Sequence, residues 1–130
     1  EMCIRDRSNF CFESTLLSNL GGLSHEERIF LATCFLHRYK IKSILADRVK
    51  INELLNNKQI SLAQTIGSAV RLGAMINGSD LEKMGHLSVT SESIILELNV
   101  SGKKIFGEVA LKRLQSVANS MKLKASINYV

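Results

Sequence analysis

The sequence contains no proline and no tryptophan, and aromatic residues make up only 5% of it. Glycine is also sparse, with 8 in 130 residues, so rigid turns should be few and most of the chain should lie in helices and strands. A run of apolar residues long enough to cross a bilayer is missing, and so is a secretory signal pattern. We therefore expect a soluble cytoplasmic protein without a membrane partner.

Cysteine is scarce too, and Cys3, Cys11 and Cys34 form no close pair. An odd number of separated cysteines argues against a disulfide scaffold and favours a reducing compartment. Cys34 lies inside the apolar block 29–36, where a free cysteine behaves as a small hydrophobic residue. We predict that Cys34 belongs to the core.

The residues needed for catalysis or metal binding do not occur in recognisable combinations. His25, His37 and His86 have no neighbouring histidine, cysteine or aspartate at a metal-ligand spacing. Gly21 and Gly22 lack the preceding strand and the following lysine of a phosphate-binding loop, and no serine or cysteine stands in a nucleophile elbow. The sequence thus predicts no catalytic residue, metal site or cofactor site in this chain, and leaves open whether the chain is part of an enzyme.

Positive charge exceeds negative charge by 5 and is concentrated in two stretches, 38–50 and 103–124. Their basic residues are Arg38, Lys40, Lys42, Arg48 and Lys50, and then Lys103, Lys104, Lys112, Arg113, Lys122 and Lys124. Stretches of this kind attract polyanions such as nucleic acid, a phosphate polymer or anionic lipid. Each stretch taken alone is more often a solvated helix face, so charge by itself does not select the partner.

The first eight residues, EMCIRDRS, have four charges and no periodicity. They look like translated sequencing-adaptor read-through, so we expect residues 1–8 to form a tail outside the fold. We expect the remainder to divide into a helical segment, 9–84, and a smaller segment with strands, 85–130.

The helical segment shows clear signals for its first two helices. Apolar residues at helical spacing predict a helix over 10–20. Ser24 and Glu27 form a capping box that starts a second helix, from residue 25 to about 39, and the apolar block of this helix suits the middle of a bundle.

Two more helices are predicted over 42–56 and 62–76, the second capped by Ser61. This last helix is rich in small residues and contains Gly67 and Gly73. Each glycine costs about 1 kcal/mol in a helix interior relative to alanine, so we expect both to allow close approach of a neighbouring element.

After residue 84 the apolar period changes from that of a helix to that of a strand. Strands are predicted over 86–90, 94–100 and 125–130, and a helix carries the apolar stripe between 106 and 121. The fold class is therefore α+β, mostly α, with a helical bundle followed by a small ββαβ subdomain.

Two polar residues stand out among apolar neighbours. Arg71 lies on a helix of small and apolar residues, where it either reaches the surface or holds a buried anion or carboxylate, and a structural role is more common. His37 ends the second helix, where its cationic form would suit the helix C-terminus.

The order of motifs resembles the C-terminal region of the exopolyphosphatase / guanosine pentaphosphate phosphatase family. The motifs are GLSHEER at 22–28, Leu31-Ala32, HRYK at 37–40 and IGSAVRLGAMI at 66–76. The terminal ββαβ segment is also similar to that of the family. The resemblance covers about residues 9–130 and is nearest to the alphaproteobacterial exopolyphosphatase branch.

The resemblance implies an HD-like helical domain that has lost its metal site. It also implies that the phosphatase site, with its Mg²⁺, lies in upstream domains of the actin-like ATPase fold. In the family this region takes part in dimer contacts and in a basic channel that holds polyphosphate. Arg38, Lys40 and Arg71 lie in or beside the matched motifs and are the candidate polyphosphate-binding residues, and Lys103 and Lys104 are candidates from charge alone.

The expected function is that of an accessory domain, for substrate holding and dimerisation, of an exopolyphosphatase that removes terminal phosphate from inorganic polyphosphate. Its expected partners are polyphosphate or guanosine pentaphosphate, reached through the full-length enzyme, and a second copy in a homodimer. The alternatives are a guanosine pentaphosphate phosphatase domain, a module for dimerisation alone, and a nucleic-acid-binding module. The last ranks lowest because only Phe106 and Tyr129 offer aromatic rings in the basic tail.

Overall fold

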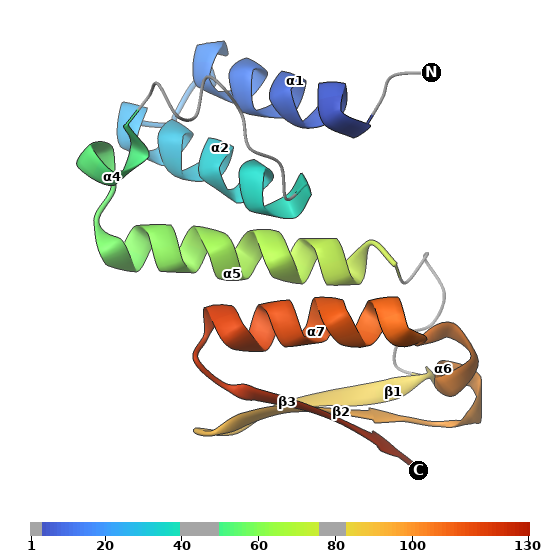
Figure 1. Ribbon diagram of the computed structural model, residues 1–130. Helices are drawn as coiled ribbons and strands as arrows, with labels where there is room; N and C mark the ends of the chain where they lie inside the picture. The colour runs from blue at the N-terminus through green and yellow to red at the C-terminus, as the bar shows by residue number, and fades with distance from the viewer. Residues whose placement is uncertain (1–3, 40–49, 76–82) are drawn as a thin grey trace. The chain divides into compact units, whose positions relative to one another are not determined.

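The computed structural model describes residues 4–39, 50–75 and 83–130, with side chains from residue 10 onward (Figure 1). The elements are α1 (Ile4–Leu17), α2 (His25–Tyr39), α4 (Ile51–Leu54), α5 (Asn57–Gly73), β1 (Gly85–Val89), β2 (Ser93–Leu98), α6 (Val100–Ile105), α7 (Glu108–Ser120) and β3 (Lys124–Tyr129). The predicted class, α+β and mostly α, is confirmed. None of the described helices is both long and apolar enough to cross a membrane.

Contacts divide the chain into two compact units, 1–67 and 68–130. The second unit begins within α5, and so contains the end of that helix together with the segment expected over 85–130. In the first unit α1 starts at Ile4 instead of residue 10, so residues 4–8 of the expected tail are helical. The buried side chains of the first unit come from α1, α2, the residue that follows α4, and the first part of α5; they include Phe12, Thr15, Ile29, Ala32, Thr33, Cys34, Leu55 and Ala63.

The predicted capping box at the start of α2 is confirmed. The Glu27 N–H donates to Ser24 Oγ at 3.2 Å, and the Ser24 N–H donates to Glu27 Oε2 at 2.7 Å. These hydrogen bonds, the backbone one first, lower the pKa of the Glu27 carboxyl because they stabilise its charged form. Both predicted ends of α2 agree with the structure.

The start of α5 corrects the sequence prediction. The helix begins at Asn57 and not at residue 62, so Ser61 lies inside it and is no cap. The cap is Asn56, whose Oδ1 accepts from the Gln59 N–H while its own N–H donates to Gln59 Oε1, both at 2.9 Å. Asparagine is typical both of turns and of helix caps, so Asn56 is compatible with the end of one predicted helix as well as with the start of the next.

The helix predicted over 42–56 lies partly outside the described residues. Within them it is reduced to the single turn of α4, because Leu55 is already extended at φ −119° and ψ 144°.

The two glycines of α5 differ in their surroundings. A Cβ on Gly67 would lie 2.5 Å from the Cys34 carbonyl oxygen, 2.6 Å from His37 Cβ and 2.8 Å from the Arg38 nitrogen, so α2 approaches α5 at this point as predicted. A Cβ on Gly73 would meet nothing within 4 Å. The packing reason expected for Gly73 is therefore wrong, and this glycine simply ends the helix.

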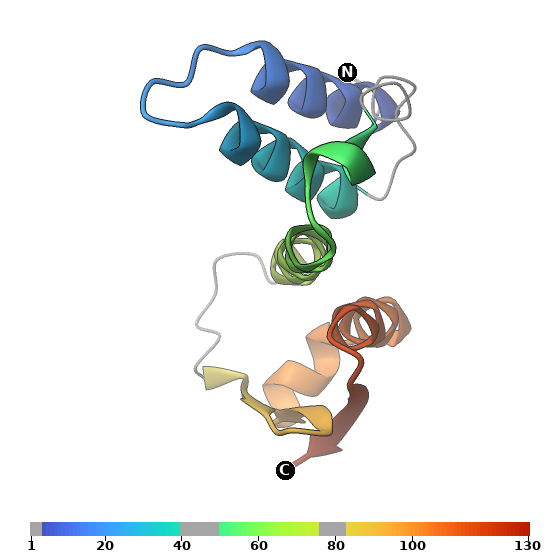
Figure 2. The same cartoon turned by 90° about the vertical axis from the view of Figure 1, so that its left-hand side faces the viewer.

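The second unit is built on a three-stranded sheet in the order β1-β2-β3. β1 pairs with β2 antiparallel, and β2 pairs with β3 parallel. A parallel pair needs a crossover, which α6 and α7 supply, and α7 lies against one face of the sheet (Figure 2). The three predicted strands agree with the structure, but α6 is an additional helix in the expected ββαβ order.

The face of the sheet toward α7 forms the core of the second unit. Side chains alternate between faces along a strand, so every second residue of β2 points into this core. The core residues are Ile94, Leu96, Leu98, Phe106, Ala110, Leu114, Val117 and Ala118. The register places His86 opposite Glu97 and Ser88 opposite Ile95 on the other face, which is therefore mainly polar.

Candidate functional site

The five candidate polyphosphate-binding residues are divided between the two units, and one of them is not among the described residues. Arg38 lies on α2 in the first unit, and Lys40 lies outside the described residues. Arg71, on α5, and Lys103 and Lys104, on α6, lie in the second unit. Of the five, the structure brings together Lys103 and Lys104.

Arg38 and its neighbour His37 are both partly buried. The Arg38 guanidinium lies 5.0 Å from the centre of the Tyr39 ring, a distance at which a cation is attracted to an aromatic face. Burial lowers the pKa of His37. The C-terminus of α2 would favour the cationic form of His37, but desolvation disfavours that form. The expectation of a cationic His37, made from its position at the helix end, is therefore corrected.

Arg71 lies in the last turn of α5, and its backbone carbonyl forms a hydrogen bond with a residue of α7. Its carbonyl oxygen accepts a hydrogen bond from Arg113 Nη1 at 2.9 Å. Carbonyls in the last turn of a helix have no partner within the helix, so Arg113 satisfies one of them. Arg113 Nε is buried without a hydrogen-bond partner among the described residues. Arg113, from the second basic stretch, therefore has a structural role.

The clearest polar arrangement lies where α6 begins, and it is organised by Asn99. Its Oδ1 accepts from the N–H groups of Ser101 and Gly102, both at 3.0 Å, which caps α6. Its amide nitrogen donates to the Lys83 carbonyl oxygen. Asn99 thereby ties the chain before β1 to the helix that carries Lys103 and Lys104.

Gly102 packs closely against the segment before β1, at the same junction between that segment and α6. A Cβ on Gly102 would lie 2.5 Å from the Met84 carbonyl oxygen and 3.0 Å from Leu98 Cδ2. Only glycine allows the backbone of α6 to come this close to the segment before β1. We call the group Lys83, Asn99, Lys103, Lys104 and Tyr129 the α6 end.

The cations of the α6 end are exposed. Lys103 Nζ lies 4.8 Å from the centre of the Tyr129 ring, at the far end of β3. Among the described residues neither Lys103 nor Lys104 forms a salt bridge; the pair found there is Lys50–Glu53, at 3.2 Å in the first unit. An exposed cation without an acidic partner remains available to an anion from solution.

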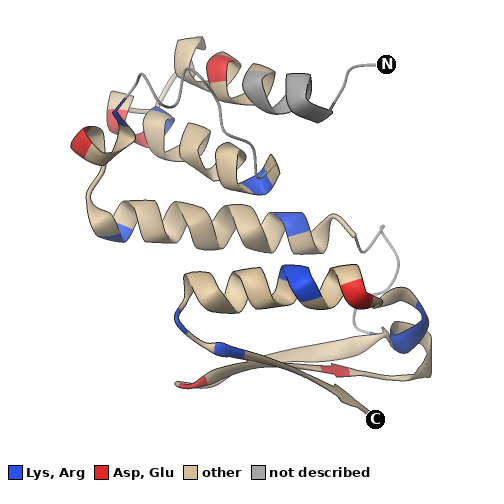
Figure 3. Ribbon diagram, in the orientation of Figure 1, with Lys and Arg blue, Asp and Glu red and all other residues tan. Residues whose placement is uncertain are grey.

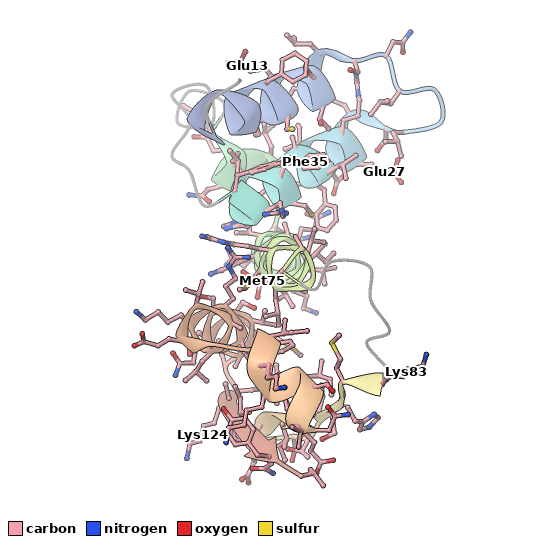
Figure 4. All side chains as sticks on the ribbon, turned by 90° about the vertical axis from the view of Figure 1, so that its right-hand side faces the viewer. Glu13, Glu27, Phe35, Met75, Lys83 and Lys124 are labelled. Carbon is pink, nitrogen blue, oxygen red and sulfur yellow. The ribbon has the colours of Figure 1, made fainter. Side chains whose placement is uncertain are left out.

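Two further lysines of the second basic stretch, Lys122 and Lys124, lie elsewhere. α6 follows the end of β2, whereas Lys122 and Lys124 precede and begin β3, which runs parallel to β2. They consequently lie at the opposite end of the sheet (Figure 3). Lys83 and Lys124 likewise extend from opposite sides of the second unit (Figure 4). The second basic stretch is therefore divided: Lys103 and Lys104 lie at one end of the sheet, Lys122 and Lys124 at the other, and the remaining two basic residues are on α7.

A hollow of about 830 Å³ lies inside the second unit. Its walls are the end of α5, β1, β2 and the inner side of α7; the lining includes Leu72, Leu87, Leu96, Phe106 and Leu114. Of the lining residues only His86, Glu97 and Asn99 are polar, and the register directs the side chains of His86 and Glu97 to the opposite face of the sheet. A lining of this composition suits an apolar group and not a phosphate chain.

Among the described side chains, no group of three or more His, Cys, Asp or Glu residues could hold a metal ion. The buried Cys34 behaves as a core residue, as predicted, and burial raises the pKa of its thiol.

In comparisons with known proteins, no family model matches the chain and no curated protein matches it.

Sequence reasoning does not place three members of the α6 end beside Lys103 and Lys104: Lys83, Asn99 and Tyr129. Asn99 had a usable signal, because an asparagine that follows a strand and stands three residues before Gly102 can cap a helix. Lys83 and Tyr129 had none, since only the register of the sheet and the Asn99 hydrogen bond bring them to α6.

Proposed function

We propose that this chain is an accessory domain of an exopolyphosphatase that holds inorganic polyphosphate while other domains cleave its terminal phosphate. The observation that carries the proposal is the α6 end. There Lys103 and Lys104 are adjacent and exposed, have no acidic partner among the described residues, and lie on a junction fixed by Asn99. The order of motifs that resembles the family supports the same assignment.

Polyphosphate has about one negative charge for each phosphate, so neighbouring lysines bind it by displacing condensed counterions, as proteins do on nucleic acid. Because every phosphate of the polymer is alike, the lysines bind any part of the polyphosphate chain equally well. A chain held in this way can advance without leaving the enzyme. The magnesium of the phosphatase reaction is expected in the upstream domains.

The test is binding of long-chain polyphosphate by the 130-residue chain at several salt concentrations. We expect binding at low salt, with the logarithm of the affinity falling linearly as the logarithm of salt concentration rises. The double variant Lys103→Gln/Lys104→Gln should weaken binding and reduce this slope.

The matched control is Lys122→Gln/Lys124→Gln, which removes the same charge from the opposite end of the sheet. Equal loss in both double variants would show attraction by net charge alone and would remove the α6 end from the proposal. No binding at low salt, or binding that does not depend on salt, would contradict the function itself. Guanosine pentaphosphate, tested in parallel, distinguishes the alternative substrate.

A further inference from the structure

The outer edge of β1 presents an unpaired row of backbone hydrogen-bonding groups. β1 is at the end of the strand order β1-β2-β3, and none of the described residues pairs with its other side. The Thr90 N–H donates to the Ser93 carbonyl at 2.8 Å, and the Asn99 N–H donates to the Met84 carbonyl at 3.0 Å. Because hydrogen-bonded and non-hydrogen-bonded pairs alternate in an antiparallel ladder, the groups directed outward are those of Gly85, Leu87 and Val89.

This edge lacks the features that usually prevent pairing between sheets. Exposed edges are protected by lysine, proline, bulges or a covering element. β1 reads Gly-His-Leu-Ser-Val, with no lysine, acidic residue or proline. β3, at the other edge, begins with Lys124 and ends at Tyr129, whose ring is covered by Lys103. The two edges therefore differ, and β1 is the one open to pairing.

The side chains of β1 add apolar surface to the open edge. Leu87 is 50% exposed and Val89 is 55% exposed, although both lie on the face of the sheet that forms the core. Leu87 also lines the apolar hollow, which reaches the edge through it. A strand added beside β1 would extend the covered face and bury these two side chains.

We propose that β1 pairs antiparallel with β1 of a second copy of this chain, across a two-fold axis that passes through Leu87. In this register Leu87 faces Leu87 of the other copy, and Gly85 faces Val89. Every outward N–H and C=O of the strand then has a partner, and the small glycine gives room to the branched valine. His86 faces Ser88 on the polar side, so no like charges meet across the axis.

The sequence of β1 favours a second copy of this chain as the pairing partner over an unrelated peptide, because it is self-complementary and has no Lys, Arg, Asp or Glu. Two-fold pairing places identical residues together, and this is destabilising wherever a charged residue lies on or near the axis. β1 has none. The strand is only 5 residues long, so the interface is small and the dimer should dissociate on dilution. The inference does not depend on polyphosphate binding.

The test is the mass of the full chain in solution, measured by sedimentation over a range of concentrations. We expect a monomer at low concentration and a dimer at high concentration. Leu87→Lys places two lysines on the axis and should raise the dissociation constant at least about tenfold. The matched control Val109→Lys introduces lysine at a valine on α7 that is 57% exposed, and should leave the dimer unchanged.

Mixing the Leu87→Lys and Leu87→Glu variants separates loss of pairing from loss of folding. Opposite charges then meet at the axis, so the mixture should recover the dimer that neither variant forms alone. Amide exchange gives a second readout: the N–H groups of Leu87 and Val89 should become protected as concentration rises, while those of His86 and Ser88, already directed to β2, should not change. A chain that stays monomeric, a dimer insensitive to Leu87→Lys, or a mixture that stays monomeric would overturn the proposal.

Discussion

Arg113 Nη1 lies 2.9 Å from the carbonyl oxygen of Arg71, so a side chain on α7 completes the last turn of α5. Two residues of like charge are joined here through a backbone acceptor, and their guanidinium groups are not paired with each other. The charge of Arg113 thus serves the fold of the second unit, and its place in a basic stretch does not make it a ligand for a polyanion.

Replacing Arg113 by methionine should destabilise the second unit. The change keeps most of the side-chain volume but leaves the Arg71 carbonyl without this donor, at a cost of about 1 kcal/mol in the free energy of unfolding. Chemical denaturation followed by circular dichroism measures the change. Lys112→Met is the control, because Lys112 is exposed on the same helix, and it should unfold like the original protein.

Gly67 and Gly73 should respond in opposite ways to replacement by alanine. At Gly67 the new Cβ would collide with the backbone of Cys34 and Arg38, and one of the two helices would have to move. Gly67→Ala should therefore destabilise the first unit, although alanine is the better helix former by about 1 kcal/mol.

At Gly73 the new Cβ meets nothing within 4 Å. Gly73→Ala should be neutral or stabilise by about 0.4–1 kcal/mol, because it restricts the unfolded chain. Thermal unfolding of the two variants side by side gives the comparison. Equal and small effects would show that the close approach of α2 and α5 at Gly67 does not persist in solution.

These glycines illustrate how far the sequence could predict the structure. Periodicity identified α2, α7 and the three strands, because each has a long apolar pattern and recognisable ends. The same reasoning assigned one cause to both glycines of α5, since the sequence does not show which face of a helix meets a neighbour. Likewise the sequence does not show that Asn56 starts α5, because turns and helix caps favour the same residue.

The candidate site was predicted less completely than the fold. Lys103 and Lys104 are adjacent in the sequence, so their proximity required no knowledge of the fold. Their neighbours Lys83 and Tyr129 reach them only through the Asn99 hydrogen bond and the parallel pairing of β3, which are long-range relations. Charge density predicted one basic stretch, but the crossover between β2 and β3 divides it.

The cap of α5 gives a direct test of the corrected helix start. Asn56→Ala removes the acceptor for the Gln59 N–H and should cost about 1 kcal/mol of stability. Ser61→Ala, which would have been damaging if Ser61 were the cap, should have little effect or raise stability slightly. Urea denaturation of both variants decides whether α5 starts after Asn56 or after Ser61. A larger loss of stability in Ser61→Ala than in Asn56→Ala would support the start predicted from the sequence.

Stability should depend on pH through His37. Burial lowers its pKa in the folded state below the ordinary value of 6.5, so the unfolded chain binds more protons in the interval between the two values. The free energy of unfolding should therefore be fully retained above pH 6.5 and should decrease as pH falls through this interval. Unfolding measured at a series of pH values should show a flatter profile for His37→Gln. Arg38→Gln, which keeps the histidine, should retain the slope; a profile for His37→Gln as steep as that of the original protein would assign the dependence to other groups.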